Sequence, residues 1–150
     1  MKGSVFVLFL YGLSCLAQAN LQNLSAKAKQ FSDYGEDFLG FGKGENNSLE
    51  HEISTELFTV ALQNKERVGA VTALLTIHLG MLCPQDRSMV ETVIHQELSH
   101  YSRQIAIDIK QVNIDVRDTK KPGVAAEALR MQSDLRELQT LLDSPKFSDR

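Results

Sequence analysis

Cysteine, proline and tryptophan are scarce in this chain of 150 residues, which has two cysteines, three prolines and no tryptophan. Cys15 lies in the first 19 residues, so Cys83 is left without a partner in the remaining chain. A fold held together by internal disulfides is therefore excluded there. We expect Cys83 to be a buried or unreactive thiol, with pairing between two chains as the alternative.

Long hydrophobic runs are also lacking. Residues 5–16 are nearly all apolar, but this stretch is too short to span a bilayer, and no later stretch is longer. It follows a short basic start and precedes Ala-Gln-Ala at 17–19, which is typical of a signal-peptidase site. We therefore predict that residues 1–19 are a cleaved signal peptide. The protein is then exported, periplasmic or extracellular, with no integral membrane segment after signal removal.

An excess of positive charge is missing as well. Without Lys2, 15 basic and 19 acidic residues remain, a net charge of −4. Binding to nucleic acid needs a basic face, and attachment to anionic membranes needs a polybasic segment. The composition favours neither partner.

Motifs for catalysis or metal binding are not found. There is no Gly-x-Ser-x-Gly elbow, and His95 and His100 are five residues apart, which places them on different faces of a helix. Glu97-x-x-His100 matches half of a di-iron motif without a second copy, and Glu91 with His95 is expected to be an ordinary solvated pair. We predict no catalytic residue, no metal and no cofactor. The carboxylates are expected on solvated faces, without a cluster that shifts their pKa values.

What the sequence does have is helical periodicity. Two long segments carry apolar residues in repeated steps of 4-4-3, which is close to the repeat of a straight α-helix. The first stripe is Leu49, Ile53, Leu57, Val60, Asn64, Val68, Val71, Leu75, Leu79 and Leu82. The second is Val90, Ile94, Leu98, Tyr101, Ile105, Ile109, Val112 and Val116. Two matched stripes joined through residues 83–86 predict an antiparallel helical hairpin.

The ends of these helices carry boundary signals. Asn47 or Ser48 is expected to cap the first arm, and Pro84 to end it. Asp86 or Ser88 is the expected cap of the second arm, and the run 120–123 ends that arm. A last helix over 123–143 has a heptad seam suited to lying along the hairpin, formed by Val124, Ala128, Met131, Leu135, Leu138 and Leu142.

The segment before the first arm is less regular. Residues 21–31 predict a short helix, whereas residues 32–48 contain four glycines and no helical period, which is typical of a flexible linker. This region is rich in aromatic side chains, namely Phe31, Tyr34, Phe38 and Phe41. We expect them to cover the hairpin, because exposed aromatic clusters are unfavourable in a monomer. The alternative is that Phe38 and Phe41 dock on a partner.

These patterns together predict an all-α fold. It is an elongated antiparallel helical bundle, with a long hairpin 49–82/87–118 plus helix 123–143 and a short N-terminal helix. The chain divides into the signal 1–19, the short helix and flexible segment 20–48, and the bundle 49–150. Asn64 is the one polar residue in the first stripe, so it either meets a polar partner across the hairpin or marks a kink.

The second arm has a further apolar face. Val93, His100, Ile107 and Ile114 are spaced by seven and lie away from the main stripe. Two stripes indicate two neighbours, so helix 123–143 is expected to cover this face. The alternative is an open face that docks a second subunit or a partner helix. Protonation of His100 would then weaken association on acidification, unless Glu97 or Asp108 pairs with the imidazolium.

The function that these features favour is binding without catalysis. We predict an exported adaptor, chaperone or inhibitor whose partner is another protein or a second copy of itself. The candidate contact residues are Val93, His100, Ile107, Ile114, Phe38 and Phe41. The alternatives are a carrier of a lipid or another hydrophobic ligand and, less favoured, a metal-binding enzyme with a dispersed site.

Overall fold

The computed structural model describes residues 2–43 and 48–143, with side chains described from residue 21 onward. They form four helices, α1 (Lys2–Gly42), α2 (Leu49–Gly80), α3 (Pro84–Asp118) and α4 (Pro122–Leu142). No strand occurs within the described ranges, and the all-α prediction is confirmed. The predicted signal, residues 1–19, lies outside the part whose side chains are described.

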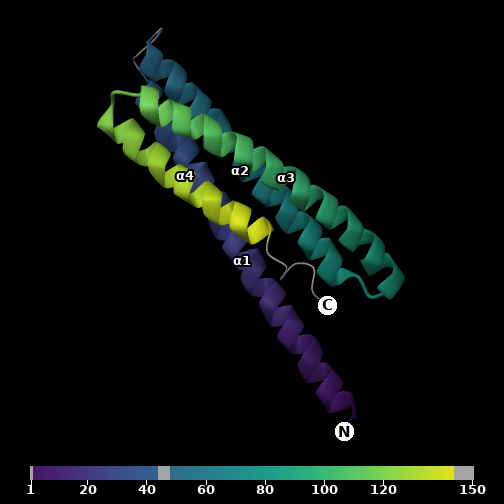
Figure 1. Ribbon diagram of the computed structural model, residues 1–150. Helices are drawn as coiled ribbons and strands as arrows, with labels where there is room; N and C mark the ends of the chain where they lie inside the picture. Colours follow the sequence, from purple (N-terminus) through teal and green to yellow (C-terminus); the bar gives the residue numbers. More distant parts are fainter. Residues whose placement is uncertain (1, 44–47, 144–150) are drawn as a thin grey trace.

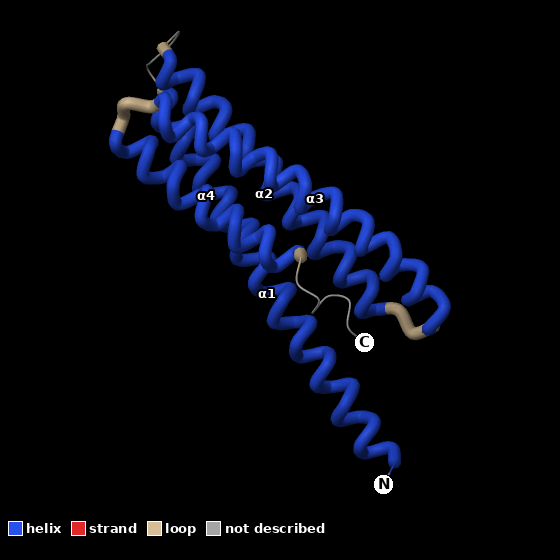
Figure 2. The backbone as a smooth tube through the Cα atoms, in the orientation of Figure 1, coloured by secondary structure: helices blue, strands red, loops and turns tan. Residues whose placement is uncertain are grey.

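Each helix runs antiparallel to the one before it (Figure 1). α1 packs against α2 and α4, and α3 packs against the same two helices on the other side. The chain is therefore an elongated up-and-down bundle, in which α1 is a full fourth member. Residues 81–83 and 119–121 form short connections (Figure 2), and the α2–α3 hairpin extends past the end of α4.

The predicted stripes form the core. All six residues of the α4 seam are buried, and in α2 the stripe is buried from Ile53 to Leu75. Leu49, Leu79 and Leu82 at the ends of the α2 stripe are exposed. In α3 the fully or nearly buried members are Ile94, Leu98, Ile105 and Val112. The helical hairpin and its apolar period are therefore confirmed. The part of the α2 stripe that is buried against other helices is shorter than the predicted stripe.

The helix ends match the prediction in part. The Ser48 hydroxyl accepts a hydrogen bond from the His51 backbone N–H at 3.1 Å, so Ser48 caps α2 as predicted. The prediction for Pro84 and for the second cap is wrong. α2 ends at Gly80, and Pro84 instead occupies the first turn of α3, where the missing N–H costs nothing. Cys83 takes the cap position without a side-chain hydrogen bond.

The N-terminal helix is longer than predicted. Residues 32–42 continue α1 instead of forming a flexible linker. Phe31 and Phe38 are fully buried, and each such side chain contributes about 1.5–3 kcal/mol, which outweighs about 1 kcal/mol for each helical glycine. The Phe58 ring of α2 lies over Gly35, 3.7 Å from the position of an added Cβ, which is an ordinary van der Waals distance.

Polar side-chain contacts join α1 to α4, and the start of α2 to the α3–α4 connection. Lys27 of α1 donates to Asp134 at 3.2 Å and to Glu137 at 2.7 Å, both in α4. The Tyr34 hydroxyl also donates to Asp134, and burial together with this carboxylate raises the pKa of Tyr34 above its ordinary value. Glu50 in the first turn of α2 accepts from the Lys120 backbone N–H at 2.7 Å. These contacts fix α1 and the α3–α4 connection to the bundle.

Candidate interaction surface

The outward side of α3 carries a line of exposed apolar residues. We call Val93, His100, Ile107 and Ile114 the open row. The side chains of Val93, Ile107 and Ile114 are 46%, 58% and 40% exposed, and His100 is exposed too. Their spacing of seven residues keeps them close to one line along the helix.

The prediction that helix 123–143 covers this row is wrong. α2 and α4 both pack on the side of α3 that carries Ile94, Leu98, Ile105 and Val112. Ile107 is two residues beyond Ile105, so the helix turns the two side chains about 160° apart. One broad face of α3 therefore serves both neighbours, and the open row stays exposed beside it.

A buried polar cluster separates the core from this outward side. Asn64 of α2 is fully buried, and its Nδ2 donates to Asp108 Oδ2 of α3 at 2.7 Å and to the Val60 carbonyl at 2.8 Å. Arg67 donates to the Asn64 Oδ1 at 3.1 Å and forms an ion pair with Asp108. Asn64 thus meets a polar partner across the hairpin, which is the first of the two predicted alternatives.

A second polar cluster lies nearer the α3–α4 connection. Gln111 Nε2 donates to Glu56 Oε2 at 3.1 Å and to Asp115 Oδ1 at 3.0 Å. Asp115 is buried, and its Oδ2 has no hydrogen-bond donor among the described residues. Burial and the adjacent Glu56 raise the pKa of Asp115 to about 7. The expectation that all carboxylates are solvated is therefore wrong for Asp108 and Asp115.

His100 of the open row is exposed and has Tyr101 as its aromatic neighbour. The two carboxylates that the sequence placed near it already have partners, since Asp108 is bound by Asn64 and Arg67. Glu97 accepts a hydrogen bond from Tyr101, which together with burial raises the Tyr101 pKa above its ordinary value. The His100 ring lies 5.7 Å from that of Tyr101. Both carboxylates are therefore engaged by groups other than His100.

A line of cations follows one side of the open row. We call Arg103, Lys110 and Arg117 the basic row. Each is exposed and lies three residues after a member of the open row, which makes the two rows neighbours on the helix surface. None of the three has an ion pair or hydrogen bond through its side chain in the described part of the chain. Sequence reasoning missed this row, although its spacing of seven was visible.

The aromatic candidates occupy a different place. Phe38 is fully buried and Phe41 is half-buried in the contact of α1 with the bundle, where Phe31, Tyr34, Phe38 and Phe41 form a chain of tilted rings. This burial agrees with the expectation that these residues cover the hairpin, and the Phe38 ring is not accessible in this structure. The structure therefore does not bring Phe38 and Phe41 together with the open row.

The tip of the α2–α3 hairpin is a second exposed apolar region. Leu82 is 90% exposed and Met89 is 70% exposed, and Ile77 and Leu79 are exposed nearby in the sequence. Cys83 is exposed as well, so of the two predicted alternatives the buried thiol is wrong and the unreactive thiol stays a prediction. The cause is the projection of this hairpin beyond α4, which leaves its end without a covering helix (Figure 1).

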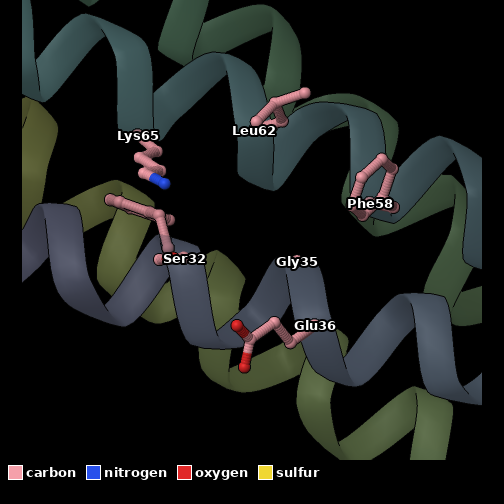
Figure 3. A pocket seen from close by; sticks show the side chains of 7 residues that line it. Ser32, Gly35, Glu36, Phe58, Leu62 and Lys65 are labelled. Atoms are coloured by element: carbon pink, nitrogen blue, oxygen red, sulfur yellow. The ribbon is translucent and has the colours of Figure 1, made fainter.

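One hollow lies between α1 and α2, with a volume of about 200 Å³. Figure 3 shows Lys65 reaching from α2 toward Ser32 of α1, with Phe58 above Gly35. Phe31, Glu36 and Leu62 complete its lining. Sites for small organic ligands usually measure about 300–1,000 Å³, so this hollow is a poor candidate for one.

Other kinds of site find little support in the described residues. Their histidines, cysteines and carboxylates form no group of three or more that could hold a metal ion. A search of the same residues gives no helix with the length and hydropathy needed to cross a membrane. Comparison of the chain with protein-family models, curated proteins and solved structures gives no match.

Proposed function

We propose that this chain is an exported binding protein that contacts another protein through the outward side of α3. The observation that carries the proposal is the open row, in which three large aliphatic side chains are at least 40% exposed and stand in one line. Single exposed apolar residues are ordinary, whereas an aligned row suits the knobs of a helix–helix contact. No catalytic group enters the proposal, and export rests on the predicted signal at 1–19.

Photo-cross-linking in the cells that make the protein tests this proposal. A photoreactive amino acid placed at Ile107 is expected to give a protein adduct of fixed larger mass. The matched control is Ser133, an exposed residue of α4 away from the row. A protein adduct at position 107 and none at 133 supports the proposal. No protein adduct at 107, or equal adducts at both positions, contradicts it.

The role of the row also predicts a contrast in stability. Ile107→Asp is expected to change the free energy of unfolding by less than about 0.5 kcal/mol, because the side chain is largely exposed. Ile105→Asp, two residues away and fully buried, should cost more than about 4 kcal/mol by burying a charge. Urea unfolding measures both. Unfolding of the Ile107 variant would assign the row to the core and remove it from the binding surface.

A second candidate, a carrier of lipid or another hydrophobic ligand, is favoured by one observation. At the hairpin tip Leu82 is 90% and Met89 70% exposed, and such side chains can enter a lipid surface. Co-flotation with neutral liposomes separates the two functions. Binding that is lost in Leu82→Asp but kept in Ile107→Asp would favour the carrier, and the absence of co-flotation would reject it.

A further inference from the structure

We propose that the outward side of α3 binds an amphipathic helix whose apolar row is flanked by acidic side chains at heptad spacing. This inference rests on the proposed function and names the chemistry of the partner. It starts from the pairing of two rows on one helix face, the open row and the basic row. Both repeat every seven residues, so both can follow a single partner helix that coils gently around α3 in the left-handed sense.

Charge complementarity selects an acidic flank. Arg103, Lys110 and Arg117 are exposed and make no side-chain ion pair with the described residues, although the mature chain has a net charge of −4. Charges beside an apolar seam set the choice and orientation of the partner in helix pairs. A partner helix with a carboxylate at every seventh residue would pair with each cation of the basic row.

The other flank of the open row carries no cation that would select an acidic partner. Gln104 and Gln111 are uncharged there, and Gln111 is bound to Glu56 and Asp115. The charged members of this flank are acidic, namely Asp118, which is exposed, and Glu97, which accepts a hydrogen bond from Tyr101. The charge pattern across the row is therefore asymmetric, with free cations on one flank only. This asymmetry fixes which flank of the partner must be acidic.

A second copy of this chain fits the surface poorly in the antiparallel arrangement. In an antiparallel pair related by a two-fold axis, each flank of the row meets the same flank of its copy. Arg103, Lys110 and Arg117 would then face one another, and like charges across a contact oppose association. A lipid surface is also disfavoured, because the open row is one residue wide and membrane-bound helices bury a broad apolar face.

The test uses two synthetic amphipathic peptides of identical apolar sequence, one flanked by glutamates and the other by lysines. Fluorescence anisotropy with the purified protein is expected to show about tenfold tighter binding of the acidic peptide at low salt, with the difference shrinking as salt rises. The triple variant Arg103→Glu, Lys110→Glu, Arg117→Glu should reverse this order. A matched control, Lys29→Glu, Lys65→Glu, Arg136→Glu, makes the same charge change at exposed sites elsewhere and should keep it.

Four outcomes would overturn the inference. These are equal binding of both peptides, reversal by the control variant, stronger binding to vesicles of phosphatidylglycerol than to either peptide, and a dimer in sedimentation that Ile107→Asp abolishes. Cross-linking at Ile107 tests the proposed function separately from the preference for an acidic partner. A protein adduct at 107 without any preference for the acidic peptide would reject the acidic partner alone.

Discussion

Asn64 is the residue that connects the two long arms at their centre. It is fully buried and joins the Val60 carbonyl, Asp108 and Arg67 in one hydrogen-bonded cluster. A buried carboxylate is costly when its donors are removed, so Asp108 depends on both Asn64 and Arg67. The sequence located the polar break, whereas its partner could be found only from the register of α3 against α2.

Asn64→Ala is expected to lower the free energy of unfolding by about 1–3 kcal/mol, because it strands Asp108. Asn64→Leu should also destabilise, since leucine fills the space but cannot donate a hydrogen bond. Urea unfolding measures both, with the exposed Asn113→Ala as the control. A neutral or stabilising Asn64→Leu would show that the cluster adds nothing to stability.

Asp115 makes stability depend on pH. Burial and Glu56 raise its pKa in the folded protein from 3.8 to about 7, so the folded chain holds a proton that the unfolded chain releases. Between these two values the free energy of unfolding falls as the pH rises. The negative charges of Glu56 in α2 and of Asp118 in the same helix both raise the pKa of Asp115. Both carboxylates act in the same direction.

Asp115→Asn removes the free-energy cost of ionising a buried carboxyl at high pH. The asparagine amide can still donate a hydrogen bond to Glu56. At pH 8 it should raise the free energy of unfolding by about 2 kcal/mol, and the gain should disappear near pH 4. Thermal unfolding across this range measures the difference, and the exposed Asp33→Asn controls for net charge. Parallel curves for wild type and Asp115→Asn at all pH values would contradict the prediction.

At the scale of the element, α1 shows how burial overrides propensity. The glycines of residues 32–42 suggested a linker, yet Leu24, Phe31 and Phe38 repeat every seven residues and are all fully buried. That spacing was present in the sequence, but the low helix propensity of glycine hid it. The contact of Phe58 with Gly35 could not be predicted, because it depends on the register between α1 and α2.

Gly35→Ala is expected to stabilise the protein by about 0.5–1 kcal/mol through the helix propensity of alanine. A methyl group there would meet the Phe58 ring at 3.7 Å, which is an ordinary contact. Gly69→Ala in α2, with nothing within 4 Å of the added Cβ, is the matched control and should gain a similar amount. A loss of stability at position 35 with a gain at 69 would mean that the α1–α2 contact tolerates no added methyl group.

In α3, two apolar stripes do not correspond to two separate neighbouring helices. Its second apolar stripe was correctly separated from the first, and the usual inference from two stripes is two neighbours. In the structure a single broad face holds both α2 and α4, since polar Ser102, Asp108 and Asp115 are buried at its edges. The sequence could not show that these polar residues widen the contact face, because their partners lie on other helices.

At the scale of the whole molecule, α1 completes the bundle by contacts that begin just after the predicted signal. Leu21 packs against the core, Leu24 is fully buried, and Lys27 reaches Asp134 and Glu137 of α4. The predicted short N-terminal helix is instead a long helix that shares its core with the hairpin and α4. The described core therefore needs α1 from about this point onward.

A truncation series follows from this arrangement. The exported protein is expected to begin at Asn20 by mass spectrometry, and a chain starting there should unfold at the same temperature as the protein recovered from its host. A chain starting at Ala28 loses Leu24 and the Lys27 bridge, and should be less stable by about 3–5 kcal/mol. Leu24→Ala in the longer chain separates the apolar part of this loss from the bridge. Equal stability of the two truncated chains would show that residues 20–27 add nothing to the bundle, and that α1 joins it only from its aromatic half.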